Sequence, residues 1–316
     1  MRILFLSSDP ISIPCLQALG SGKITGVEVS GVICNPDQRK GRGKKMQKNP
    51  VAEAAESLGL PILQTSRLTA ENLVRLNFFD AALVFAFGQI LSRKVLDLCP
   101  GRFLNFHASP LPLLRGASPI ESAIAEGWDT TGVCLMQVTR AMDAGPVGAR
   151  MTLPIQPDET GPSLREKIAT RSVELLENFS AQRFDSLPWK EQDHGKATYC
   201  RKLCKADAGI DFSLPAREVF NRFRAFAGWP GASFSIRREV IKVDDLRVED
   251  ESGQPGQILA AGERLQIATG RQSISIGRLQ RPTKKMLPFA EFQKQAKLQP
   301  GQRLSYRLSR PLTYRR

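Results

Sequence analysis

The sequence predicts an α/β chain of two domains, a mostly parallel sheet covered by helices followed by a small β-barrel. Apolar runs alternate with helical patterns over the first half of the chain, which is typical of βαβ units. The pattern then changes to short alternating segments separated by turn residues, as in small barrels. The length of 316 residues is sufficient for two hydrophobic cores.

Apolar runs predict the strands of the first domain, and helical patterns predict its helices. The predicted strands are residues 2–7, 27–34, 81–87, 102–107 and 131–138. The predicted helices are residues 13–19, 51–58, 70–76, 91–98, 119–126 and 160–184. Pro119 suits the first turn of its helix. We expect a Rossmann-like sheet with ligands outside the carboxyl ends of its strands, where Gly88 and His107 fall.

A change of composition predicts the domain boundaries. Residues 189–207 are polar and basic and are interpreted as a connector between a first domain, 1–188, and a second, 208–316. The second domain should hold one helix, Val219 to Ala227, ending at a glycine- and proline-rich turn. Its strands are expected within residues 233–248, 257–270 and 271–280.

The overall composition is that of an ordinary globular protein, with 41% hydrophobic and 24% charged residues. The apolar run at the N-terminus is too short for a signal peptide, and no segment approaches transmembrane length. Six cysteines are scattered without the spacing of a zinc site, which favours free thiols. These features predict a cytoplasmic protein.

Positive charge is concentrated in two regions. Residues 208–316 carry 20 Lys or Arg against 10 Asp or Glu, and residues 36–48 carry six against one. Basic regions on either side of a neutral body indicate a polyanion held at two places, although a basic run is often only a solvated surface. We expect the first region to be disordered without RNA, because its glycines keep it pliable.

The segment from Phe103 to Ile120 holds the candidate catalytic residues. Strand alternation places Asn105 and His107 on one face at the end of an apolar strand. An amide beside an imidazole can stabilise an oxyanion, and Asp143 from a later turn could meet His107 there. A lone histidine on a strand is more often structural, but the chain has only two histidines. We interpret this group as catalytic.

Two common nucleotide motifs are absent from the sequence. No GxGxxG follows the first strand, where the chain reads Ser7-Ser8-Asp9-Pro10, so NAD and FAD are disfavoured. No Walker A motif supports phosphoryl transfer from ATP.

Several motifs that the chain does contain resemble those of the methionyl-tRNA formyltransferases, a branch of the 10-formyltetrahydrofolate-dependent formyltransferases. The central motifs are NFHASPLP at 105–112, RGASPI at 115–120, MDAGP at 142–146 and VFAFGQIL at 84–91. Tyr199, Lys202 and Asp207 resemble the family's linker. The tRNA branch is indicated by the basic loop and by two C-terminal segments, AFAGWPGA at 225–232 and Leu279-Gln280 with Lys284-Lys285. The chain departs from the family at Pro110, where leucine is usual, and at Ser7-Ser8, where a Gly-Thr-type turn is usual.

The resemblance implies that the α-amine of methionyl initiator tRNA attacks the formyl carbon of 10-formyltetrahydrofolate, for translation initiation. Asn105 and His107 would donate to the oxyanion, and Asp143 would stabilise the imidazolium or relay the proton. No metal is implied. The implied folate contacts are Phe87, Gly88, Gln89, Ile90, Ser109, Pro110, Leu111 and Pro112. The implied tRNA contacts are Lys40, Arg42, Lys44, Lys45 and Lys202, supported by an OB-like barrel, in a chain expected to be a monomer.

Three other functions use parts of the same pattern. A formyltransferase for glycinamide ribonucleotide or an amino sugar nucleotide would share the three catalytic residues but would not need the two basic regions. A folate-dependent hydrolase would replace the amine with water. A non-enzymatic RNA-binding protein would explain the charge and leave the catalytic group idle.

Overall fold

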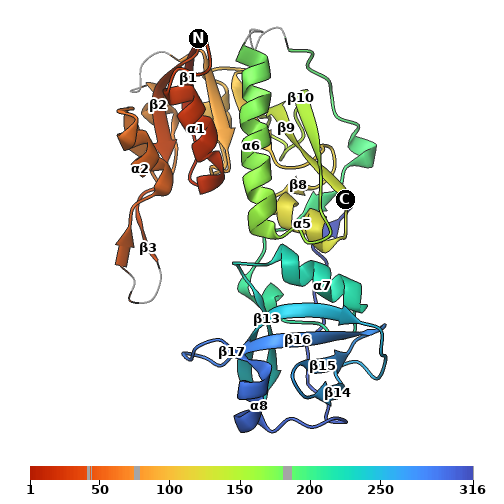
Figure 1. Cartoon of the computed structure of the whole chain (residues 1–316). Coiled ribbons are helices and arrows are strands. Elements are labelled where there is room, and N and C mark those ends of the chain that lie inside the picture. Colours follow the sequence, from red (N-terminus) through yellow and green to blue (C-terminus); the bar gives the residue numbers. More distant parts are fainter. Residues whose placement is uncertain (41–42, 44, 75–78, 181–186, 316) are drawn as a thin grey trace.

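Two hydrophobic cores organise the chain. The computed structural model describes residues 1–40, 43, 45–74, 79–180 and 187–315 (Figure 1). The first core holds buried side chains between Ile3 and Leu203 together with Ala225, Phe226 and Leu312, and the second holds those between Ile210 and Leu304. The α/β prediction and the two-core organisation are therefore confirmed. The boundaries at 188 and 207 stay a prediction.

The first domain contains a seven-stranded sheet in the order β10-β9-β7-β6-β1-β2-β5. Its strands are β1 Arg2–Leu6, β2 Glu28–Cys34, β5 Ile62–Gln64, β6 Ala81–Phe85, β7 Phe103–His107, β9 Thr130–Gln137 and β10 Val147–Pro154. The strands from β5 to β7 pair in parallel, whereas β9 pairs antiparallel with both β7 and β10. The predicted mostly parallel sheet is confirmed, with two additional edge strands, β5 and β10.

Helices cover both faces of this sheet, because alternate strand residues are apolar on each side. The helices are α1 Ile13–Gly20, α2 Pro50–Ser57, α3 Ala70–Val74, α4 Arg93–Leu96, α5 Pro119–Ala125 and α6 Gly161–Ser180. Leu16, Ala52, Ile124 and Leu176 join α1, α2, α5 and α6 to one face. Leu73 and Val95 join α3 and α4 to the other face. Pro119 lies in the first turn of α5 as predicted.

The first basic region forms a hairpin. Strands β3 Gln38–Lys40 and β4 Lys45–Gln47 pair antiparallel, and the hairpin extends beyond the sheet domain on the side of the second domain (Figure 1). The backbones of these two strands satisfy each other's hydrogen bonds, whereas residues 41, 42 and 44 lie outside the described residues, so the expectation of disorder without RNA stays a prediction.

The second domain is an antiparallel, barrel-like sheet in the order β12-β13-β16-β15-β14, with β17 on β16. Its strands are β12 Ala232–Ile236, β13 Glu239–Glu249, β14 Ile258–Ala261, β15 Leu265–Ala268, β16 Ser273–Gln280 and β17 Leu287–Pro288. The prediction of a single helix is wrong, because α8 Phe289–Ala296 follows the last strand. Phe289, Phe292 and Ala296 of this helix lie in the second core.

Helix α7, Ala216–Ala225, joins the two domains. Ala216 and Val219 lie in the second core, whereas Ala225 lies in the first. The buried guanidinium of Arg224 donates to the carbonyl oxygens of Gln156 and Glu159 of the first domain, at 3.1 Å each. The helix predicted for the barrel alone is therefore also the contact between the domains.

The end of the chain returns to the first domain. Strand β18, Thr313–Tyr314, pairs with β11, Tyr199–Cys200, which pairs in parallel with β8, Arg115–Gly116. Leu312 is buried in the first core. The predicted connector thus contributes a two-residue strand that lies between β8 and the C-terminal segment.

Asp207 ties this connector together, and its ionisation should set part of the stability. Arg201 donates to both carboxylate oxygens of Asp207, at 2.9 and 2.5 Å, and the Cys204 N–H donates at 2.7 Å. Burial raises the pKa of Asp207, but these hydrogen bonds outweigh burial and lower its pKa to about 2. The folded-state pKa lies below the unfolded value of about 4, so the stabilisation is present above pH ~4 and is lost as the pH falls toward 2.

We expect Asp207→Asn to lower the free energy of unfolding at pH 7 by on the order of 1 kcal/mol, after allowing for solvent screening. The variant should also lose part of the stability change between pH 5 and pH 2, measured by urea denaturation. Asp158→Asn is the control, because Asp158 is exposed. An identical pH dependence in Asp207→Asn and the wild type would contradict this account.

Candidate active site

His107 ends strand β7 and is 5% exposed. Its Nε2 lies 3.0 Å from the carbonyl oxygen of Leu114. A carbonyl oxygen only accepts hydrogen bonds, so Nε2 must carry a proton. The nitrogen left for chemistry is Nδ1. It holds a lone pair in the neutral ring and an N–H in the imidazolium.

Asp143 lies in the loop between β9 and β10 and faces this nitrogen. Its Oδ2 is 3.8 Å from Nδ1 of His107 and accepts the Gly116 N–H at 2.8 Å. The Asp143 backbone has a φ of 50°, in the left-handed region that Asp tolerates better than most residues. The predicted meeting of Asp143 and His107 is present in the structure. One amine nitrogen or water oxygen can lie within hydrogen-bond distance of both groups.

Asn105 lies two residues before His107 on the same face of β7. Its side chain is half-buried and makes no hydrogen bond to any residue that the structure describes. A positioned amide with free N–H donors is suited to a developing oxyanion. His107 can donate from Nδ1 only as the imidazolium, so Asn105 is the donor available in either protonation state.

The loop after β7 contains four of the predicted folate contacts. The Ser109 hydroxyl is buried and donates to the Leu113 carbonyl at 2.6 Å, and Leu111 is buried against Cys134 and Met136. These two side chains therefore shape the loop. Pro110 and Pro112 are half-buried. Direct folate contact stays a prediction for all four residues.

The turn after β6 contains the other four predicted folate contacts, which are residues 87–90. Phe87 is buried, and Gly88 has a φ of 76°. The Gln89 amide donates to Asn35 Oδ1 at 2.8 Å and to the Thr65 carbonyl at 2.7 Å, and accepts from the Leu68 N–H. Gln89 therefore ties three loops together, whereas Ile90 is 97% exposed and available to a ligand.

A cavity of about 260 Å³ lies at the start of β7, between the segment before that strand and the segment after β9. Its lining residues are Arg93, Leu96, Asp97, Pro100, Gly101, Phe103, Val138, Thr139 and Arg140. Phe103 is two residues before Asn105 on the same strand face, and Arg140 is three residues before Asp143. None of these residues was predicted from the sequence, because only the fold brings segment 93–101 against segment 138–140.

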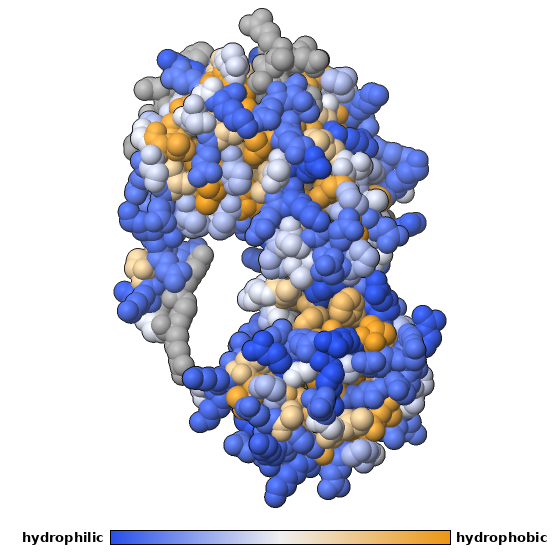
Figure 2. Space-filling view, in the orientation of Figure 1, coloured by the Kyte–Doolittle hydropathy of each residue, from blue (hydrophilic) through white to orange (hydrophobic). Residues whose placement is uncertain are grey.

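The predicted tRNA contacts lie in the hairpin and the connector. Lys45 is exposed in β4, and Lys202 is exposed just after β11. Lys40 ends β3, while Arg42 and Lys44 lie outside the described residues. Figure 2 shows a hydrophilic hairpin arm separated by an opening from the body of the two domains.

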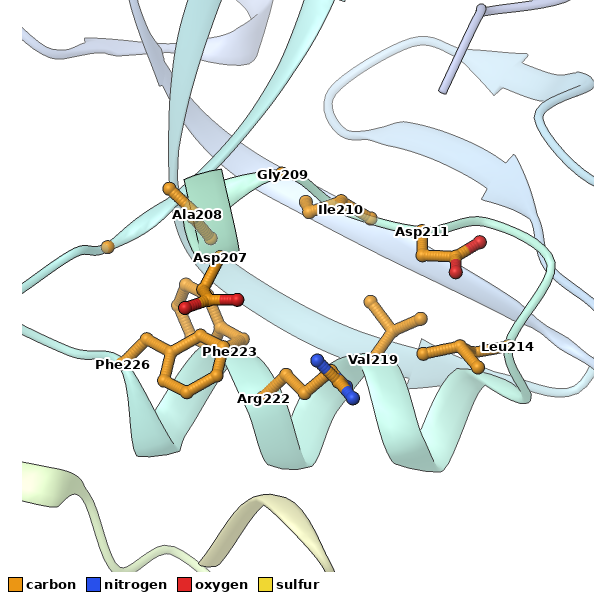
Figure 3. A pocket seen from close by; sticks show the side chains of 12 residues that line it. Asp207, Ala208, Gly209, Ile210, Asp211, Leu214, Val219, Arg222, Phe223 and Phe226 are labelled. Atoms are coloured by element: carbon orange, nitrogen blue, oxygen red, sulfur yellow. The ribbon is translucent and has the colours of Figure 1, made fainter. Parts of the chain in front are cut away.

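A second, much smaller cavity lies along α7, away from the catalytic loops. It has a volume of about 10 Å³, which is room for about one water molecule. Figure 3 shows the Arg222 side chain extending along α7 toward Val219, with Asp207 and Asp211 on the segment opposite the helix. Burial lowers the pKa of Arg222, against the attraction of Glu126, Asp207 and Asp211. This cavity is too small for a folate.

The described residues contain no cluster of three or more His, Cys, Asp or Glu that could hold a metal ion. Nor do they include a helix of sufficient length and apolarity to cross a membrane.

Two family models match the chain, one in each domain. The family model "Formyl transferase" matches residues 1–178, and "Formyl transferase, C-terminal domain" matches residues 202–297. Methionyl-tRNA formyltransferase of Roseiflexus castenholzii is 36% identical over 312 residues, covering 96% of this chain and 99% of the relative. That of Sulfurihydrogenibium sp. is 33% identical over 316 residues, with the same coverage of both chains.

Solved structures share the fold at lower identity. Methionyl-tRNA formyltransferase from Clostridium thermocellum aligns with a TM-score of 0.56 and 16% identity, covering 80% of this chain and 95% of that one. WlaRD, a sugar 3N-formyl transferase, aligns with a TM-score of 0.66 and 16% identity, covering 90% and 99%. From the match of the family model to more than half of its residues, and from its full-length relatives, the chain belongs to the formyltransferase family.

Proposed function

We propose that this protein transfers the formyl group of 10-formyltetrahydrofolate to the α-amino group of methionyl initiator tRNA. The observation that carries the proposal is the full-length similarity to methionyl-tRNA formyltransferases, which includes the basic second domain. Positive charge in the hairpin and in the second domain favours a polyanionic acceptor over a small molecule. The catalytic face supplies the groups that the reaction requires.

The reaction exchanges one carbon–nitrogen bond for another. The methionine nitrogen forms a bond to the formyl carbon, and the bond from that carbon to N10 of the folate breaks. The attacking nitrogen loses a proton and N10 gains one. Nδ1 of His107 lies where it can accept the proton and return it, and Asp143 stabilises the charged ring.

The tetrahedral intermediate places negative charge on the formyl oxygen. Asn105 supplies a donor for that oxygen, and such a donor typically contributes about 2.7–4 kcal/mol to transition-state stability. Because Asn105 has no other partner among the described residues, it loses no hydrogen bond when it turns to the intermediate.

The folate is proposed to enter through the 260 Å³ cavity. Leu96, Phe103 and Val138 give it apolar walls, which suit a flat pterin ring, and Arg93 and Arg140 supply positive charge for the anionic tail. Phe103, which lines the cavity, lies two residues before Asn105 on the same strand face, so we expect a ring held there to present N10 toward Asn105. Ile90 and the loop Ser109–Pro112 remain the predicted contacts around it.

The tRNA is proposed to lie across the opening between the hairpin and the second domain. Lys40, Arg42, Lys44 and Lys45 would bind phosphates on one side, and Lys202 on the other. Charged initiator tRNA is a cytoplasmic substrate, so the protein is proposed to work there, as a monomer.

The test is a formyl-acceptor assay. The protein, incubated with 10-formyltetrahydrofolate, should formylate methionyl initiator tRNA and should leave free methionine and a dTDP-linked amino sugar unmodified. The His107→Ala protein is the matched blank. Formylation of the amino sugar but not of the tRNA would overturn the proposed acceptor, and folate hydrolysis without any acceptor would indicate a hydrolase.

A further inference from the structure

We propose that Gln192, oriented by the buried Arg115, is a positioning residue that holds the Asp143 loop in its working conformation. The inference rests on the proposed function, because it concerns how the same site is held in place. Neither residue contacts the reacting groups in this arrangement. Their effect passes through the backbone of the loop that carries Asp143.

Gln192 is 7% exposed and lies against that loop. Its Nε2 donates to the carbonyl oxygen of Asp143 at 2.9 Å and to that of Gly145 at 2.7 Å. Both amide hydrogens are therefore used on the loop. The contact at Asp143 itself supports a backbone whose φ of 50° is sparsely populated for residues other than glycine.

Arg115 fixes the orientation of this amide. Its Nε and Nη2 donate to Oε1 of Gln192 at 3.1 and 2.7 Å. A guanidinium can only donate, so the amide oxygen must face Arg115 and the NH₂ group must face the loop. Further contacts, to the Tyr199 hydroxyl at 3.3 Å and to His194 Nδ1 at 3.1 Å, hold the guanidinium itself.

The residue type at position 192 is informative. Arg115 is 2% exposed and has no carboxylate partner among the residues that the structure describes. A buried cation is usually paired with a carboxylate, and a glutamate at 192 would provide one. A glutamate has no N–H to donate to the two loop carbonyls. Glutamine is therefore the residue that satisfies Arg115 and the loop together.

Three consecutive residues connect this network to both catalytic groups. The Leu114 carbonyl accepts from His107, the Arg115 side chain holds Gln192, and the Gly116 N–H donates to Asp143 Oδ2 at 2.8 Å. Loss of Gln192 removes the contact on the far side of the loop. The carboxylate of Asp143 should then move away from Gly116 and from His107.

The Gly116 amide reports this geometry without substrate. In Gln192→Ala, we expect hydrogen exchange at the Gly116 amide, measured by NMR, to be about 10-fold faster or more. We also expect kcat to fall by about 10- to 100-fold, with the KM values for folate and tRNA within about threefold of the wild type. Because the exchange measurement needs no activity, it separates failure of this inference from failure of the proposed function.

The matched control is Gln293→Ala. Gln293 also donates to two backbone carbonyls, of Leu298 and Ala261, but it lies in the second domain. Its loss should change neither Gly116 exchange nor kcat. If Gln293→Ala and Gln192→Ala have the same effects, the role of Gln192 is merely structural and the proposal fails.

Gln192→Glu separates positioning from packing. This variant keeps an oxygen for Arg115 and nearly the same volume, but it places a carboxylate against the carbonyls of Asp143 and Gly145. We expect kcat to fall at least as far as in Gln192→Ala. Recovery of wild-type kcat and Gly116 protection in Gln192→Glu would overturn the proposal.

Discussion

His107→Ala and Asp143→Ala are each expected to lower kcat for formyl transfer by about 10²- to 10⁴-fold, the range typical of a lost acid or base. The Kd for charged tRNA should stay within about twofold of the wild type, because neither side chain lies in the basic hairpin or the connector. The expected loss of kcat has a physical reason, which is that Nδ1 of His107 is the nitrogen that exchanges the proton. It is the ring nitrogen left free by Leu114, and Asp143 is the carboxylate that faces it. The measurements are single-turnover formylation and filter binding of charged tRNA.

Two further variants separate a loss of chemistry from a loss of stability and from a general effect of removing a carboxylate. His107→Asn retains part of the buried volume, so a fall in kcat without a large fall in Tm assigns the loss to chemistry. Asp250→Ala serves as the carboxylate control, because Asp250 is exposed in the second domain. An Asp143→Ala protein that retains wild-type kcat, or loses tRNA affinity as strongly as turnover, would contradict the assigned roles.

The KM for charged tRNA is expected to rise steeply with salt, by about 10- to 150-fold between 50 and 200 mM for about two to four phosphate contacts. Binding of the folate should change little over the same range. The reason is that each lysine or arginine on a phosphate releases condensed counterions from the RNA. The quantity to measure is the slope of log KM against log salt concentration.

Single charge removals test where this slope originates. Lys45→Ala and Arg42→Ala should each reduce the slope by about 0.7–0.9 and leave the KM for folate unchanged. Lys23→Ala is the control, because Lys23 pairs with Glu177 on the first domain, outside the hairpin and the connector. An unchanged slope in both hairpin variants would remove the hairpin from tRNA binding.

The fold was predictable where a segment carries its own periodicity. The runs that became β1, β2, β6, β7 and β9 are each five or more residues long and mostly apolar. Strand β5, Ile62–Gln64, has three residues, and the exposed Arg150 and Thr152 interrupt the apolar pattern of β10. Helix α8 was missed although Phe289, Phe292 and Ala296 follow a helical spacing that the sequence contains.

The residues of the candidate site were predictable from the sequence. The residues that hold them in place and the cavity were not. Asn105 and His107 share a strand face, which alternation alone establishes. Gln192 and Arg115 carry no such pattern, because they are 77 residues apart and meet through hydrogen bonds. The 260 Å³ cavity is likewise formed by segments with no local relation to one another.

The sequence by itself determined the two-domain α/β plan, the three polar residues of the candidate site and the two basic regions. These follow from side-chain chemistry and from periodicities of two or 3.6 residues, which are local properties. Only the tertiary structure decided that Leu114 leaves Nδ1 of His107 free. It also decided that the last strand returns to the connector and that a glutamine holds the Asp143 loop. Those contacts join residues distant in the chain, and their geometry exists only once the two cores have packed.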